Sequence, residues 1–233
     1  MPESPRLRRS MMLVTGGDRA LLDRTVSSDA DIICMDLEDS VTDKEAARKL
    51  AASLLARPMR AEIAIRINPV SSVEGLQDLL MLRSMPVMPS LVKMTRVIDP
   101  YEVRLAGEIL PDTGLVVIIE TAEGLEQASA IAKASKNVVA LSLGGKDLSK
   151  TMGCDRNWQG LLFARGRLVQ AAATAGVRAF DEPYRPLDDL DGLREHCRNI
   201  AAMGFSGKTT VDLRHIPIIN DLLGHRAMAY CSP

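Results

Sequence analysis

Eight apolar runs alternate with helix-like segments along the whole chain, and this alternation constrains the fold more than any other feature. Most of the runs are rich in β-branched residues without polar alternation, which is typical of strands buried on both faces of a parallel sheet. The runs are 10–16, 31–37, 62–68, 90–94, 115–121, 138–144, 177–182 and 207–211. Strict β–α alternation predicts a parallel sheet with helical crossovers. Eight units in 233 residues favour a (β/α)8 barrel, for which roughly 250 residues is typical; an open doubly wound sheet is the alternative.

The segments between these runs carry helix start and stop signals. The expected helices are 18–28, 42–56, 73–85, 99–110, 124–135, 158–176 and 190–204. Thr42 or Asp43 is suited to cap the second helix, and Gly176 and Gly204 are suited to end the last two. The segment 216–225 is a weak helix candidate. We find no linker and expect one domain over residues 1–233.

Composition excludes several classes of function. A formal net charge of −1 and 3% aromatic residues give no basis for nucleic-acid binding. The basic opening is followed only by the short apolar stretch MMLV, and no run is long enough to span a membrane. The four scattered cysteines (Cys34, Cys154, Cys197 and Cys231) indicate reduced thiols rather than a zinc site. We therefore expect a cytoplasmic protein.

Charged residues follow every expected strand. In a (β/α)8 barrel the carboxyl ends of the strands carry the active site, so these residues predict a polar pocket at one rim. They are Arg19, Asp36, Glu38, Asp39, Arg66, Lys93, Glu120, Asp147 and Asp181.

Glu120 and Asp147 stand just past the apolar parts of two consecutive expected strands. Two carboxylates at the same end of a parallel sheet suit a hard divalent cation, and oxygen-only ligation with open positions favours Mg²⁺ over zinc. The alternative is that each carboxylate merely caps the helix after it. Arg66 is costly to bury unless it is paired, so we expect an acidic partner or an anionic ligand.

Other polar residues admit two interpretations. Asp36 and Glu38 either support the site or only mark the exit of a strand, and Lys93 is a candidate partner for them inside the barrel. The pair Gly144–Gly145 allows a ligand to approach backbone N–H groups at a helix start. His196 is expected to face solvent, and His215 and His225 lack a metal-binding spacing. Motifs for a serine or cysteine nucleophile, a phosphate-binding loop or a dinucleotide are absent.

Together the strand-end motifs resemble the HpcH/HpaI aldolase and citrate lyase β-subunit family. The matching segments are RRSMMLVTGGDR (8–19), DIICMDLEDSV (31–41), IAIRINP (63–69), LVVIIETAEGL (115–125), VVALSLGGKDLS (138–149), LLFARGRLVQAAATAG (161–176) and FSGKTTVDLRHIPIIN (205–220). Their order and spacing cover nearly the whole chain.

The resemblance implies a TIM barrel that binds Mg²⁺ through Glu120 and Asp147, with Arg66 gripping a carboxylate or keto oxygen of the substrate. It implies carbon–carbon bond cleavage or formation beside a carbonyl, on citryl-, malyl- or citramalyl-CoA or on free 2-oxo or 2-hydroxy acids. It also implies a homo-oligomer, with a trimer favoured. The expected catalytic residues are Arg66, Glu120 and Asp147, and the expected substrate-binding residues are Arg66, Gly145, Asp36, Glu38, Arg19 and Lys93.

Three departures from the family pattern concern the use of CoA. Lys146 stands where the family has an acid, Asp212 and Leu213 replace the usual His and Pro, and the first loop reads VTGGDR. The chain also ends soon after the eighth strand, where many thioester-cleaving relatives continue into a lid. An aldolase for free acids, or a keto-acid-binding protein without catalysis, therefore stays open as an alternative.

Overall fold

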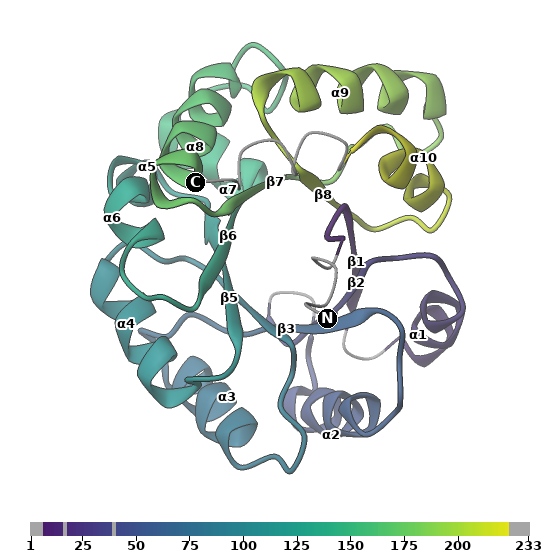
Figure 1. Ribbon diagram of the computed structural model, residues 1–233, viewed down its shortest axis with the longest axis vertical. Coiled ribbons are helices and arrows are strands. Elements are labelled where there is room, and N and C mark those ends of the chain that lie inside the picture. Colours follow the sequence, from purple (N-terminus) through teal and green to yellow (C-terminus); the bar gives the residue numbers. More distant parts are fainter. Residues whose placement is uncertain (1–6, 16–17, 39–40, 224–233) are drawn as a thin grey trace, which may run out of the picture.

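The computed structural model describes residues 7–15, 18–38 and 41–223. Eight parallel strands close into a barrel in sequence order, with β8 paired to β1 (Figure 1). They are β1 (Ser10–Thr15), β2 (Ile32–Asp36), β3 (Glu62–Arg66), β4 (Leu91–Met94), β5 (Gly114–Ile119), β6 (Val138–Leu143), β7 (Arg178–Asp181) and β8 (Gly207–Thr210). The predicted (β/α)8 barrel is confirmed, and each observed strand lies within one residue of its expected start.

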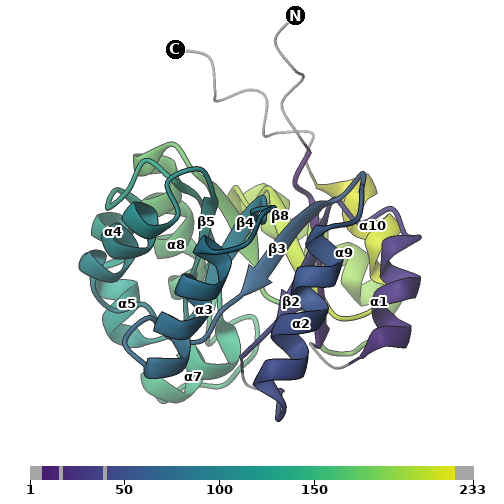
Figure 2. The same ribbon diagram turned by 90° about the horizontal axis from the view of Figure 1, so that it is seen from below.

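Helices surround the strands in both views (Figures 1 and 2). They are α1 (Arg19–Val26), α2 (Lys44–Leu55), α3 (Val73–Arg83), α4 (Pro100–Ile109), α5 (Ala122–Glu126), α6 (Ala128–Ala132), α7 (Gly145–Met152), α8 (Leu162–Ala175), α9 (Leu190–Met203) and α10 (His215–Leu222). Within the described residues, no helix has the length and apolar character needed to cross a membrane.

The helix predictions differ from the structure in three places. The single helix expected over 124–135 is two short helices, α5 and α6, which meet at Gln127. The helix α7, between β6 and α8, begins at Gly145, whereas the capping alternative for Asp147 placed the start of this helix after Asp147. The helix expected over 158–176 begins only at Leu162. The weak last candidate does form a helix, α10.

Local signals that end or begin helices behave as the sequence predicts. Asp43 caps α2, because its carboxylate accepts a hydrogen bond from the N–H of Ala46. Gly176 and Gly204 end α8 and α9 with φ of 68° and 109°, a left-handed conformation that costs glycine little. These ends direct the chain from the helical shell into β7 and β8.

The strands bury both faces. Inward-facing apolar side chains form a small cluster inside the barrel, while a larger cluster fills the space between strands and helices. The inner cluster is Met11, Ile32, Cys34, Ala64, Leu91, Val116, Ala140 and Phe180. Gly207 leaves space for the ring of Phe180, since a Cβ at Gly207 would lie 2.5 Å from that ring. The packed interior leaves the carboxyl ends of the strands as the place where polar side chains gather.

Candidate active site

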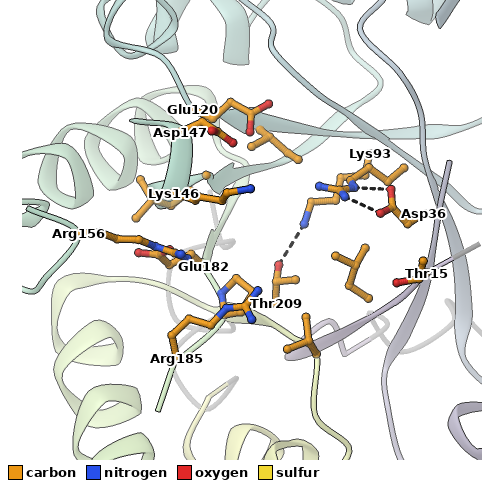
Figure 3. A pocket seen from close by; sticks show the side chains of 18 residues that line it. Thr15, Asp36, Lys93, Glu120, Lys146, Asp147, Arg156, Glu182, Arg185 and Thr209 are labelled. Carbon is orange, nitrogen blue, oxygen red and sulfur yellow. Dashed lines mark hydrogen bonds and ion pairs between the residues drawn. The ribbon is translucent and has the colours of Figure 1, made fainter. Parts of the chain in front are cut away.

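A cavity of about 350 Å³ opens where the strands end. Six residues that the sequence places in the site line it together: Asp36, Arg66, Lys93, Glu120, Gly145 and Asp147. Figure 3 labels four of them, Asp36, Lys93, Glu120 and Asp147. They come from β2, β3, β4, the end of β5 and the start of α7, so the barrel brings residues more than a hundred positions apart to one pocket.

Arg66 is held by two acidic partners. Its Nε and Nη2 donate to the two oxygens of Asp36 at 2.7 and 2.6 Å, and its Nη1 lies 3.0 Å from Oε2 of Glu38. Burial alone would lower the pKa of Arg66, but the Asp36 hydrogen bond and both negative charges raise it above its ordinary value. The acidic partner expected for Arg66 is therefore present, and its guanidinium is fixed before any ligand binds.

Glu120 is buried, with 8% of its surface exposed. Its Oε1 accepts a hydrogen bond of 2.6 Å from the backbone N–H of Arg96, which adopts a left-handed φ of 52°. Burial raises the pKa of the Glu120 carboxyl, and the Arg96 hydrogen bond and the charge of Arg66 offset only part of this effect. Thr121, not Glu120, caps the following helix, so the capping interpretation of Glu120 is wrong.

Asp147 lies in the first turn of α7, whose N-cap residue is Gly144. Burial acts to raise its pKa, but the hydrogen bond from Lys150 at 2.8 Å and the charges of nearby cations hold it below the ordinary value. Asp147 therefore stays ionised and is not the cap of its helix. Its negative charge is also one of the causes that raise the pKa of Glu120.

The oxygen atoms of Glu120 and Asp147 are suitable ligands for a magnesium ion. Glu120 and Asp147 supply oxygen atoms only, and both face the open cavity. Mg²⁺ is commonly bound through one or two carboxylates, with water and ligand oxygens in its other positions. Nowhere in the described residues, this site included, are three or more His, Cys, Asp or Glu side chains arranged to hold a metal, so a cation at this pair would take its other ligands from water or substrate.

Lys93 points into the barrel from β4 and is 4% exposed. Its Nζ donates to Oγ1 of Thr209 at 3.1 Å. Burial lowers the pKa of Lys93, and the charge of Arg66 lowers it further. The expected acidic partner for this ammonium is thus replaced by a hydroxyl group, although Glu120 and Asp36 act on it through space.

The two glycines at the start of α7 allow two carboxylates to pack closely. A Cβ at Gly144 would lie 2.4 Å from Cβ of Glu120, and a Cβ at Gly145 would lie 2.2 Å from Oε1 of Glu182. Either side chain would displace a charged group that lines the cavity. An alanine at Gly144 would clash with Cβ of Glu120, and an alanine at Gly145 would require the carboxylate of Glu182 to shift.

The sequence analysis missed several residues that line the cavity: Lys146 as a site residue, Arg156, Glu182, Arg185 and Thr209. Glu182 pairs with Arg156, whose Nε donates at 2.9 Å, and lies 3.4 Å from Nη2 of Arg165. Glu182 follows Asp181 at the end of β7, and that strand-end position was a usable signal. The arginines come from loops that no strand pattern marks.

Two other expected residues lie outside the cavity lining. Glu38 contacts Arg66 from behind, and Arg19 is exposed at the start of α1, 3.4 Å from Asp23. Asp39 lies outside the described residues. Asp181 is fully buried and points away from the cavity, toward Lys208, Arg165 and His196.

The prediction that His196 faces solvent is wrong. Its Nε2 lies 2.8 Å from Oδ2 of Asp181, its side chain is only 15% exposed, and its ring packs against Trp158 and Tyr184. Burial lowers the pKa of His196 despite the neighbouring carboxylate. His215 is buried as well and bonds to Thr210 and to the carbonyl of Leu187, 3.2 and 2.9 Å away. Both histidines hold α9 and α10 to the rim of the barrel.

A closed (β/α)8 barrel with ionised groups gathered at the carboxyl ends of its strands has the architecture of a barrel enzyme. Comparison with known proteins gives the family. The sequence profile described as HpcH/HpaI aldolase/citrate lyase matches residues 9–212, and the chain belongs to this family, several of whose curated members are named as lyases.

Three relatives illustrate the similarity. Citrate lyase subunit beta from Haemophilus influenzae is 34% identical over 93% of this chain and 80% of its own length. RipC from Yersinia pestis has a TM-score of 0.82 and 30% identity, covering 94% of this chain and 96% of that one. CitE from Mycobacterium tuberculosis, in complex with magnesium, acetoacetate and coenzyme A, has a TM-score of 0.80 and 25% identity, covering 93% and 80%.

Proposed function

We propose that the protein is a magnesium-dependent carbon–carbon lyase that cleaves or forms a short hydroxy-acyl-CoA such as citryl-, malyl- or citramalyl-CoA. The observation that carries the proposal is that Glu120, Asp147 and Arg66 line a single cavity at the carboxyl ends of the strands. A relative of similar fold binds magnesium, a small oxo acid and coenzyme A together, which supports the same combination here.

Glu120 and Asp147 would hold the magnesium ion in this site. When bound, it would act as a Lewis acid on an oxygen of the 2-oxo or 2-hydroxy acid. The chain's own contribution is electrostatic and positional. Arg66, locked by Asp36 and Glu38, would donate to the substrate oxygen on which negative charge grows. Donors that are already oriented need no reorganisation during the reaction, which is how such sites lower barriers.

In the cleavage direction, the substrate hydroxyl loses its proton and its oxygen becomes a carbonyl. The electrons of the broken carbon–carbon bond pass to the thioester fragment, which leaves as an enolate and then takes up a proton. The products are an oxo acid and an acyl-CoA. The reverse reaction is an aldol or Claisen-type addition of the same enolate to the carbonyl of the oxo acid.

The size of the cavity favours a short acid at the reacting end. About 350 Å³ is near the lower end of the range for small-molecule pockets, roughly 300–1,000 Å³. The acyl group would fit inside, while the nucleotide of the carrier would have to remain outside. An aldolase that acts on free hydroxy-oxo acids is the second candidate, because the same cavity holds such an acid without a carrier. A homotrimeric assembly and a cytoplasmic location stay predictions from the sequence.

Substitution of the carboxylate pair tests the proposal. Glu120→Gln and Asp147→Asn keep side-chain size and remove a negative charge, so we expect loss of Mg²⁺ binding by calorimetry. We also expect turnover to fall by roughly a hundredfold or more, because the electrostatic contribution of such groups reaches that size. Release of acetyl-CoA and an oxo acid from the three thioesters, and of two carbonyl fragments from free hydroxy-oxo acids, separates the two candidates.

Glu126→Gln provides the matched control, since Glu126 is an exposed carboxylate at the end of α5 outside the cavity lining. It should bind Mg²⁺ and turn over like the unaltered protein. Full activity of both site variants in the presence of a chelator would remove the metal-dependent mechanism. Binding of an oxo acid without product from any substrate would leave a ligand-binding protein instead.

A further inference from the structure

Four of the nine charged side chains that line the cavity pair with one another. Asp36 is paired with Arg66, and Glu182 is paired with Arg156. Asp147 accepts from Lys150 outside the lining. Of the three other cations in the lining, Lys93 donates to Thr209, which leaves Lys146 and Arg185 to be explained.

Lys146 and Arg185 line the cavity and are exposed. Among the residues that the structure describes, neither side chain has a hydrogen bond or an ion pair. Figure 3 shows Lys146 extending into the cavity beneath Glu120 and Asp147, with Arg185 farther along the same side. Two unpaired cations therefore face the space that a ligand of Glu120 and Asp147 would occupy.

The charge balance of the cavity points to a ligand with more than one negative group. Five basic and four acidic side chains line it, and a divalent cation would add two positive charges. A monoanionic oxo acid bound at the metal would leave most of this excess without compensation. Because Lys146 and Asp147 are consecutive, an acid held at Asp147 has its far end within the reach of a lysine side chain.

We infer that Lys146 and Arg185 form an anion subsite that binds a second negative group of the ligand, beyond the one held at the carboxylate pair. The inference rests on the proposed use of this cavity for oxo acids. The second group is either another carboxylate of the acid, which makes the ligand a dicarboxylate, or a phosphate of the thioester carrier. The subsite thereby sets which short acid or carrier the pocket accepts.

Two acids that differ in one carboxylate, together with free coenzyme A, distinguish a second carboxylate of the acid from a phosphate of the carrier as the group bound at the subsite. Oxaloacetate has a second carboxylate, and 2-oxobutyrate has the same chain length without it. Calorimetric titration in saturating Mg²⁺ measures the dissociation constant of each, and free coenzyme A reports the phosphate contribution. A charge-assisted hydrogen bond, discounted for solvent exposure, corresponds to about a tenfold change in affinity.

For Lys146→Gln we expect oxaloacetate to bind about tenfold more weakly while 2-oxobutyrate is unchanged. Arg185→Gln should act in the same direction. If Lys146→Gln weakens the binding of coenzyme A instead, and the affinities for both acids are unchanged, the group bound at the subsite is a phosphate of the carrier. Unchanged binding of all three ligands, or an equal loss for all three, would overturn the subsite.

Two controls exclude trivial explanations. Lys133→Gln makes the same charge change at an exposed lysine outside the cavity lining, so it should leave all three affinities unchanged. Titration of Mg²⁺ alone into Lys146→Gln should show undiminished affinity, since the removed charge is a cation beside Asp147. Weaker dicarboxylate binding would then not come from loss of the metal.

Failure of the subsite and failure of the proposed function give different results. Selective loss of oxaloacetate binding in Lys146→Gln, without turnover of any thioester by the unaltered protein, would keep the subsite and reject the lyase. Turnover of a thioester whose KM is unaffected by both substitutions, together with unchanged binding of all three ligands, would keep the lyase and reject the subsite.

Discussion

The salt bridge between Asp36 and Arg66 allows a quantitative test of how the site is built. Asp36 is 1% exposed and Arg66 is 16% exposed in their side chains. Asp36→Asn keeps the shape but replaces one carboxylate oxygen by an NH2 group. This group would face Nη2 of Arg66, which now donates to Asp36 over 2.6 Å, so two donors would oppose each other.

The loss of stability expected for Asp36→Asn depends on how deeply the ion pair is buried and on the acidic partner that Arg66 keeps. Removing one partner of a buried ion pair typically costs about 3–5 kcal/mol. Glu38 still lies 3.0 Å from Nη1 of Arg66 and keeps part of the compensation. We therefore expect the lower end, about 3 kcal/mol of unfolding free energy. For a chain of this size that lowers the melting temperature by roughly 6–12 °C.

Urea unfolding followed by circular dichroism, together with calorimetric melting, measures both quantities. Asp23→Asn is the matched control, because Asp23 is 53% exposed and its two arginine partners lie 3.4 Å away. We expect it to cost less than about 1 kcal/mol, as exposed ion pairs usually do. A loss for Asp36→Asn no larger than that of Asp23→Asn would refute the reasoning.

A double-mutant cycle with Arg66→Gln isolates the pair. Because Asp36 and Arg66 contact each other directly, the double variant should lose clearly less stability than the sum of the two single variants. Additive losses would mean that each residue acts through other neighbours.

Two further predictions concern close packing and burial. Gly145→Ala should destabilise the protein by about 1–3 kcal/mol, because the new methyl group would lie 2.2 Å from Oε1 of Glu182. The control Gly166→Ala, on the open side of α8, should instead stabilise the protein by about 0.5–1 kcal/mol. Equal effects of the two substitutions in urea unfolding would contradict the packing described. Burial raises the pKa of the Cys34 thiol to about 11, so iodoacetamide at a pH of about 8, followed by peptide mass spectrometry, should label half-buried Cys154 and leave Cys34 unmodified until the protein unfolds. Comparable labelling of the two cysteines would place Cys34 outside the barrel interior.

The strands could be predicted from the sequence because burial on both faces leaves a direct trace in composition. A run such as LVVII (115–119) is apolar on both faces and is therefore expected to be buried on both, and β–α alternation then leaves few topologies. Where burial is less complete, the pattern is weaker. The helix expected over 124–135 breaks at Gln127, and no residue type in that segment signals the break.

The residues of the site also fall into those that the sequence predicts and those that it does not. Arg66 ends β3, Glu120 directly follows β5, and Asp147 lies in the first turn of the helix after β6, so the fold itself brings them together. Arg156 and Arg185 lie in connections whose path depends on tertiary packing, and sequence periodicity carries no information about that path. His196 illustrates the same limit, because its inward direction results from the pairing with Asp181, which no single-helix pattern encodes.

The cavity combines charges that are already neutralised with charges that are not. Arg66 with Asp36 and Glu38, and Arg156 with Glu182, form compensated pairs that hold their shape without a ligand. Glu120 is different, since burial raises its pKa and its ionised form is therefore disfavoured in the folded protein. A cation that binds between Glu120 and Asp147 would remove this penalty, so part of the folding stability sacrificed at the site would return as binding free energy. The barrel makes this possible because its strands hold Glu120 close to Asp147 even when no cation is bound.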